Sequence, residues 1–286
     1  MGKKGVNYRH VYHAGNFADV VKHVILARVL TYMGLKPQPY RVIDTHAGAG
    51  IYDLRSPEAG KTSEWRDGIA RLLAAPRPDD INRLLQPYLD AVAAVNSGGT
   101  LLTYPGSPII ARRLMRPGDH LVANELHPND YASLKIALRG AVDSKVLNID
   151  AWLAVKSLLP PKERRAVVLI DPPFEKPDEF DRLAEAMDEA LKRFATGIFV
   201  IWHPVKDEAA ADRLRARVSR ASGCKVLGVR LRICNPEPGL GLTETGILIV
   251  NPPFVLEDEL KNLLPFLASV LREGPGAAFT LAGSSQ

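Results

Sequence analysis

Residues 167–177 read "VVLIDPPFEKP", in which four apolar residues lead directly into an acid, two prolines and a phenylalanine. The apolar run is typical of a buried strand. Pro172 and Pro173 fix their own φ angles and push the residue before each of them away from the helical conformation. The stretch therefore predicts a buried strand that ends on a rigid, non-helical segment.

Four further apolar runs also end on polar or turn-forming residues before a helical pattern begins: "YRVIDTHAGAG", "HLVANELHP", "SKVLNIDAW" and "TGIFVIWHP". This alternation predicts a mostly parallel sheet covered by helices on both faces. Near the C-terminus, "CKVLGVRLRI" and "TGILIVN" have only the turn-rich "CNPEPGLGLTE" between them, which predicts a hairpin with an antiparallel last strand. We expect an α/β fold of five parallel strands plus this hairpin, the element order of the Rossmann-like class I methyltransferase sheet.

The interval between the first two strands is far longer than a simple βα unit needs. Its apolar residues recur at helical spacing, so we expect a small helical subdomain at residues 55–103, inserted into a discontinuous core of residues 1–54 and 104–286. The tail "GPGAAFTLAGSSQ" carries no such pattern and can be loose.

The composition is that of an ordinary globular protein and argues against a fibrous, disordered or membrane protein. The net charge of +5 suits a polyanionic partner without demanding one. The only two cysteines, Cys224 and Cys234, match no metal-binding spacing and suit a reducing interior. Neither a signal peptide nor a membrane span is evident, so we expect a soluble, cytoplasmic protein without a metal.

The loop "DTHAGAG" indicates a ligand site at the carboxyl edge of the sheet, because Gly48 and Gly50 let a ligand approach the backbone. Asp53 stands where the dinucleotide fingerprint requires a third glycine, which disfavours a dehydrogenase. His46 can be a ligand contact or a hydrogen-bonded structural residue. Glu125 ends the second strand and can bind the two hydroxyls of a ribose. Asp150 can accept from an adenine amino group or cap the following helix.

Asp171 should lie at the same edge. Its carboxylate and the Pro172 carbonyl can accept hydrogen bonds from an exocyclic amino group, while the Phe174 ring offers a face for a base. We expect an exposed Asp171, whose loss abolishes turnover without harming the fold. The repeat Asn251-Pro252-Pro253-Phe254 should lie at the opposite edge, because its strand runs the other way.

The segment "NYRHVYHAGNFADVVKH" resembles a helix start capped by Asn16. That structure leaves Tyr8, His10, His13 and Lys22 without an evident structural role. Their rings and charges suit a segment that closes over cofactor and RNA.

The chain resembles the RlmJ family of 23S ribosomal RNA adenine-N6 methyltransferases. The resemblance covers nearly the whole chain, to about residue 272, and rests on these stretches in this order: "YRHVYHAGNFADVVKH", "DTHAGAG", "YPGSP", "ELHP", "LIDPPF", "RFATGIFVIWHPV" and "NPPF". The resemblance implies methyl transfer from S-adenosylmethionine to one adenine N6, with S-adenosylhomocysteine as product. It implies Tyr8 as a substrate contact, Asp171 as the proton acceptor, and His23, His46, Ser107, Glu125, Asp150 and Asp171 as the cofactor set. From the residues themselves we add Pro172 and Phe174 to the catalytic set, Lys22 and Phe174 to the substrate contacts, and Gly48 and Ala151, next to Asp150, to the cofactor set. In this sequence Phe174 replaces a common tyrosine and Ala151 a typical glycine.

The expected partner is 23S rRNA, with no membrane and no obligatory protein partner. The adenine must be unpaired or flipped to reach Asp171. We expect the basic clusters at residues 112–116 and 162–165, with the helical insertion, to contact phosphates. Two alternatives remain: a DNA adenine-N6 methyltransferase, or a nucleic-acid-binding protein with a degenerate cofactor pocket.

Overall fold

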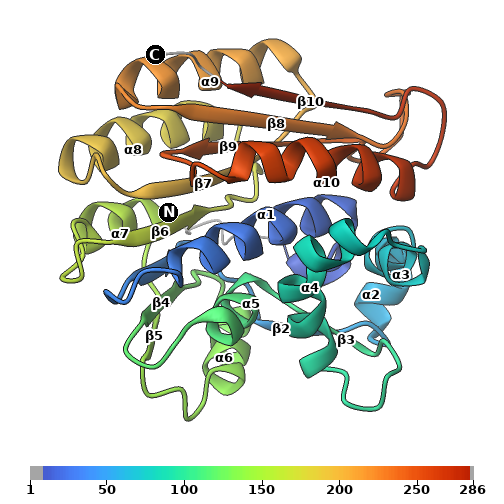
Figure 1. Ribbon diagram of the computed structural model, residues 1–286, viewed down its shortest axis with the longest axis horizontal. Helices are drawn as coiled ribbons and strands as arrows, with labels where there is room; N and C mark the ends of the chain where they lie inside the picture. The colour runs from blue at the N-terminus through green and yellow to red at the C-terminus, as the bar shows by residue number, and fades with distance from the viewer. Residues whose placement is uncertain (1–8, 284–286) are drawn as a thin grey trace, which may run out of the picture.

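The computed structural model describes residues 9–283 and contains an eight-stranded sheet in the order β10-β8-β9-β7-β6-β1-β4-β5 (Figure 1). Five neighbouring strands are parallel. They are β1 (Arg41–Asp44), β4 (His120–Asn124), β5 (Ser144–Leu147), β6 (Ala166–Ile170) and β7 (Ile198–Pro204). β9 (Glu244–Val250) pairs antiparallel with both β7 and β8 (Val226–Arg232). The predicted sheet is therefore confirmed, and the hairpin inserts its second strand next to β7.

Within the described residues, the tail that was expected to be loose forms the eighth strand of the sheet. β10 (Ala278–Gly283) pairs antiparallel with β8 over the register Ala278↔Arg232 to Gly283↔Leu227. Its side chains are half-buried or exposed, so the strand has little apolar pattern. Backbone pairing with β8 orders this edge, and single-sequence periodicity does not report such pairing.

Helices cover both faces of the sheet (Figure 1). α7 (Ala151–Leu158), α8 (Glu179–Arg193) and α9 (Glu208–Ser222) share one apolar core with alternate residues of β6 such as Val168. The other face, to which Val167 points, carries α1 (Phe17–Met33), α5 (Ser107–Leu114), α6 (Pro128–Ala137) and α10 (Leu256–Val270). Because β6 is covered on both faces, it is a continuous apolar run, as parallel strands usually are.

The helices expected between residues 55 and 103 are present. They are α2 (Pro57–Thr62), α3 (Ile69–Ala74) and α4 (Asp79–Ala94), joined by the 3-10 turn η2 (Glu64–Arg66). The segment is bracketed by β2 (Ile51–Asp53) and β3 (Thr103–Pro105), which pair antiparallel. α4 packs against α1 and α5 in the same apolar core as the sheet. That residues 55–103 form a subdomain of their own stays a prediction.

A second 3-10 turn, η1 (His10–Tyr12), precedes α1. Nowhere between residues 9 and 283 is a helix both long and apolar enough to span a bilayer.

Candidate active site

A cavity of about 530 Å³ opens at the carboxyl edge of the parallel strands. This volume lies within the range of small-molecule sites. Within residues 9–283, all of the predicted site residues line it: Lys22, His23, His46, Gly48, Ser107, Glu125, Asp150, Ala151, Asp171, Pro172 and Phe174. Tyr8 lies outside the described residues. The fold thus brings together residues separated by up to about half of the chain, while their individual roles stay predictions.

The glycine loop after β1 approaches the cavity with its backbone. Gly48 has φ +60°, and a Cβ built there would lie 2.0 Å from the Tyr52 hydroxyl oxygen. The Gly48 N–H donates to Oε2 of Glu125 at 2.8 Å. This position therefore strongly favours glycine, and the hydrogen bond ties the loop to the acid at the end of the neighbouring strand.

Two of the predicted acids lie where the sequence placed them. Glu125 also accepts from the His127 N–H at 2.7 Å, and burial raises the pKa of its carboxyl. Oδ1 of Asp150 accepts from the N–H groups of Trp152 and Leu153 at 3.0 and 3.1 Å. The helix-cap interpretation of Asp150 is therefore confirmed, and the residue still lines the cavity, so a ligand contact remains compatible with the cap.

A buried acid lies under the glycine loop. The Ser107 hydroxyl donates to Oδ2 of Asp44 at 2.7 Å, and burial raises the pKa of Asp44 to about 7. His46 lies with Nδ1 2.8 Å from Oγ1 of Thr45, and burial lowers its pKa to about 4. This histidine is thus neutral at neutral pH, and one of its ring nitrogens can accept a hydrogen bond.

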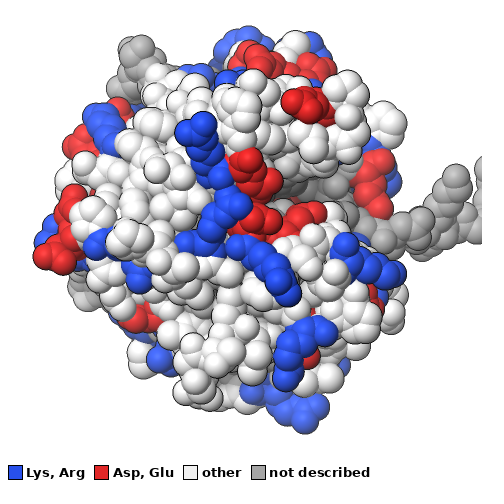
Figure 2. Space-filling model, turned by 90° about the vertical axis from the view of Figure 1, so that its right-hand side faces the viewer, with Lys and Arg blue, Asp and Glu red and all other residues white. Residues whose placement is uncertain are grey.

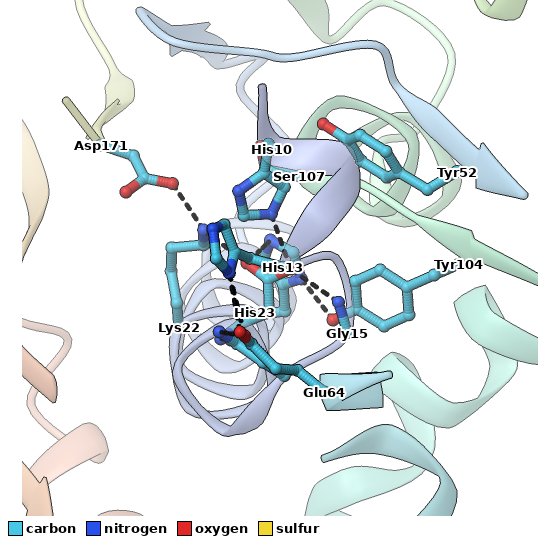
Figure 3. Close-up of polar contacts among 12 residues, drawn as sticks. His10, His13, Gly15, Lys22, His23, Tyr52, Glu64, Tyr104, Ser107 and Asp171 are labelled. Atoms are coloured by element: carbon cyan, nitrogen blue, oxygen red, sulfur yellow. Dashed lines mark hydrogen bonds and ion pairs between the residues drawn. The ribbon is translucent and has the colours of Figure 1, made fainter. Parts of the chain in front are cut away.

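Lys22 joins two carboxylates at the floor of the cavity (Figure 3). Its Nζ lies 2.5 Å from Oδ2 of Asp171 and 2.8 Å from Oδ1 of Asp19. Burial alone would lower the pKa of Lys22, but the two carboxylates outweigh it and the pKa is raised. The Asp171 side chain is only 15% exposed. The expectation of an exposed Asp171 without structural contacts was therefore wrong.

Asp19 accepts hydrogen bonds from groups at and just before the start of α1. Besides Lys22 it accepts from the Gly15 N–H at 2.9 Å, and Nε2 of His10 lies 2.8 Å from its Oδ2. Burial acts to raise the pKa of Asp19, yet His10 and Lys22 hold it well below its usual value. Asp19 is thus a fixed anion that orients Lys22.

Other residues near the N-terminus also have partners. The predicted cap of α1 is confirmed, because the Asn16 side chain accepts from the Asp19 N–H at 2.9 Å. Nδ1 of His13 lies 2.9 Å from Oε1 of Glu64, which ties this segment to η2. The expectation that His10, His13 and Lys22 lack structural contacts was therefore wrong: each contacts a carboxylate that their one-dimensional spacing does not reveal.

His23 is buried and its ring stacks on Tyr104 at 5.6 Å, with Nδ1 2.7 Å from the tyrosine hydroxyl. Burial lowers its pKa to about 3, so the imidazole is neutral.

Phe174 has φ +51°, and its ring lies 4.8 Å from that of Phe180 and 5.7 Å from that of Trp202. Trp202 was not among the site residues predicted from the sequence. The available signal was its position: it lies in "VIWHP" at the end of β7 just as Asp171 ends the neighbouring strand β6.

The second Pro-Pro-Phe segment lies away from the cavity, as predicted. β9 runs antiparallel, so its last residue, Val250, pairs with Phe199 near the start of β7. The Asn251 side chain donates to the carbonyls of Ala195 and Gly197, each at 2.7 Å, and Phe254 is 78% exposed.

Two predicted phosphate contacts are not supported by the fold. Arg116 is paired with Asp119 at 3.0 Å and donates to the Gly34 carbonyl at 2.9 Å. Arg165 donates to the Met33 carbonyl at 3.1 Å. Both arginines lie shortly before the first residue of a parallel strand, and therefore at the amino edge of the sheet. That edge is about 17 Å, one strand length, from the edge at which the cavity opens. These two arginines hold loops together there.

In the part of the chain that the structure describes, no group of three or more His, Cys, Asp or Glu side chains could hold a metal ion.

Comparison with known proteins gives one consistent result. The family model "Ribosomal RNA large subunit methyltransferase D, RlmJ" matches residues 37–280. The "Ribosomal RNA large subunit methyltransferase J" of Escherichia coli K12 is 38% identical over 266 residues, 93% of this chain and 94% of the relative. The protein of the same name from Haemophilus influenzae is 39% identical over 275 residues, 95% and 96% of the two chains. A crystal structure of a Legionella pneumophila protein, 33% identical, superposes with a TM-score of 0.84 over 96% of this chain and 98% of that one.

Proposed function

Because the chain belongs to the RlmJ family of ribosomal RNA large subunit methyltransferases, we propose that it transfers a methyl group from S-adenosylmethionine to the N6 of one adenine in 23S rRNA. One observation carries the chemistry. Asp171 and Pro172 line the same cavity as the glycine loop, Glu125 and Asp150. An acceptor pair for an amino group therefore adjoins residues suited to a nucleoside cofactor.

The residues present fit S-adenosylmethionine. The backbone at Gly48 lacks the Cβ that would obstruct a close approach, and Glu125 can accept from ribose hydroxyls. Asp150, Ala151, His23, His46 and Ser107 line the same cavity, and a carboxylate such as that of Asp150 can accept from an adenine amino group. When bound, the cofactor supplies an electrophilic methyl group on a sulfonium.

Asp171 and Pro172 act on the target amine. An adenine N6 is a poor nucleophile because its lone pair is delocalised into the ring. Acceptance of its two N–H bonds by the Asp171 carboxylate and the Pro172 carbonyl favours localisation of that pair toward the methyl group. Asp171 would accept the N6 proton that the amine releases once it is methylated.

Lys22 keeps Asp171 oriented for this step. Oδ2 of Asp171 accepts from Lys22, while Oδ1 has no hydrogen-bond partner within residues 9–283. The free oxygen can accept from N6 while the other holds the side chain in place. Asp19 in turn fixes Lys22 from the opposite side. We assign Lys22 and Asp19 as positioning residues on this geometry.

The substrate base must leave any helix to reach the cavity, at a cost of a few kcal/mol. Phe174 then offers a ring on which the extruded adenine can stack. An enzyme of ribosomal RNA acts where ribosomes assemble, which agrees with the cytoplasmic location expected from the sequence.

A methylation assay tests the proposal. Purified protein is incubated with methyl-labelled S-adenosylmethionine and either 23S rRNA transcripts or duplex DNA, and modified nucleosides are identified by mass spectrometry. We expect N6-methyladenosine in the RNA only. Labelling of DNA alone would replace the substrate with that of a DNA methyltransferase. Absence of S-adenosylmethionine binding by calorimetry would favour the module with a degenerate pocket.

A further inference from the structure

The cavity extends past Asp171 into a part that neither the cofactor set nor the catalytic residues explain. We call this part the second lobe. It is lined by Trp202, Pro204, Lys206, Ile233 and Leu242. These residues come from the end of β7, from the residues just after it, and from the connection between β8 and β9. The turn-rich connection therefore does more than join two strands, because it closes one wall of the cavity.

Trp202 is the aromatic surface of the second lobe. Its indole N–H donates to Oγ1 of Thr245 at 2.7 Å, which fixes the ring on β7 against β9. The ring remains partly exposed, since it lines the cavity, and it meets Phe174 edge to face at 5.7 Å. A held, partly exposed indole next to the ring proposed for the target adenine suits a second nucleobase.

Charges of both signs line the cavity at the second lobe, where Glu175 and Glu273 lie together with two lysines that can contact phosphate. Lys206 and Lys176 are both exposed, line the cavity, and make no ion pair with any residue from 9 to 283. On the face of the molecule seen in Figure 2, Lys and Arg side chains lie along one side of a hollow at which Asp and Glu side chains also gather. Mobile lysine ammonium groups beside an aromatic surface are the usual means of holding single-stranded nucleic acid.

We propose that the second lobe binds the nucleobase adjacent to the target adenine, stacked on Trp202, with Lys176 and Lys206 contacting the flanking phosphates. This inference rests on the proposed function. It adds a subsite that helps to hold an unpaired segment of RNA after the target base is extruded. Sequence-specific RNA recognition commonly uses such splayed, stacked bases.

The subsite is tested by measuring, with fluorescence anisotropy, the affinity for an RNA oligonucleotide that contains the target adenine in its unmethylated form. Base stacking on an aromatic residue contributes about 1–3 kcal/mol, so Trp202→Leu should weaken binding about 5- to 150-fold. Trp202→Phe, which keeps an aromatic face, should stay close to the wild type. Phe254→Leu, at an exposed ring outside the cavity, is the matched control and should change nothing. Unchanged S-adenosylmethionine affinity in each variant shows that the fold is intact.

The base that occupies the lobe is identified with RNA that carries an abasic nucleotide on one side of the target or the other. At one of these positions, the abasic nucleotide should weaken binding to the wild type by the same factor by which Trp202→Leu weakens binding to intact RNA. The same abasic RNA should bind Trp202→Leu no more weakly than intact RNA does. Equal losses in wild type and variant at both positions would overturn the subsite, as would wild-type affinity in Trp202→Leu. If the wild type methylates RNA while the variants behave identically to it, only the subsite fails. If the wild type neither binds nor methylates RNA, the proposed function fails with it.

Discussion

Nζ of Lys22 lies 2.5 Å from Oδ2 of Asp171, although the two residues are far apart in the sequence. The contact joins the first turns of α1 to the end of β6. It makes the proposed proton acceptor part of a buried triad with Asp19. Catalysis and stability are therefore linked at this contact, so both turnover and the free energy of unfolding should be measured for each substitution there.

Asp171→Asn should lower the rate of methyl transfer about 100-fold or more, because an amide can accept from N6 but cannot take its proton. Affinity for S-adenosylmethionine, measured by calorimetry, should stay within a few-fold of the wild type. Asp171→Ala should in addition lose about 3 kcal/mol of the free energy of unfolding, since it leaves the Lys22 ammonium with one carboxylate fewer. Wild-type turnover in either variant would refute the assignment.

Lys22→Met should reduce turnover more than cofactor affinity and lower the free energy of unfolding by about 3 kcal/mol, because it leaves Asp171 without its cationic partner and Asp19 with His10 alone as its charged partner. The exposed Lys261, paired with Asp258 at 2.8 Å, is the control: Lys261→Met should change stability by less than about 1 kcal/mol. In chemical denaturation, the double variant Lys22→Met/Asp171→Asn should lose less than the two single losses combined. Strict additivity would show that the pair is not coupled.

Gly48→Ala should lower affinity for S-adenosylmethionine at least 10-fold, because the new Cβ would collide with the Tyr52 hydroxyl and displace the loop. Gly99 also has a positive φ, of +75°, but a Cβ there has open space around it. Gly99→Ala should therefore cost only about 1 kcal/mol of stability from backbone strain and leave cofactor affinity unchanged. Equal cofactor affinities in the two variants would argue against the placement of the ligand at this loop.

The pH dependence of stability should report Asp44. Burial raises its pKa from 3.8 to about 7, so between these values the folded chain holds a proton that the unfolded chain has released. The contribution to stability is complete below about pH 4 and is lost as the pH rises to about 7. Over this interval the wild type should lose up to about 4 kcal/mol relative to Asp44→Asn, which cannot ionise. Urea unfolding of both proteins at several pH values provides the measurement, and parallel curves would contradict the prediction.

Asn251→Ala should leave methyl transfer unchanged, because this Pro-Pro-Phe segment lies at the other edge of the sheet. It should still destabilise the protein by about 1–3 kcal/mol, since the side chain donates to two backbone carbonyls. A loss of turnover without a loss of stability would instead place Asn251 in the reaction.

The sequence alone determined the five parallel strands, the C-terminal hairpin, and the edge at which Gly48, Glu125 and Asp171 meet. This was possible because apolar periodicity reports burial, and because the carboxyl ends of parallel strands share one edge. The same rule separated Asp171 from Asn251. It also places the loops before the strands, with Arg116 and Arg165, at the amino edge, although charge clustering had suggested a phosphate contact for them.

Only the tertiary structure decided what each of these side chains touches. No periodicity predicts that Lys22 reaches Asp171, that His10 contacts Asp19, or that Trp202 meets Phe174, because such contacts depend on how helices dock on the sheet. β10 was missed for a related reason: an edge strand is held by backbone hydrogen bonds, which leave little trace in side-chain pattern. Local pattern thus specifies elements and edges, while the pairing of buried charges and rings is fixed by three-dimensional packing.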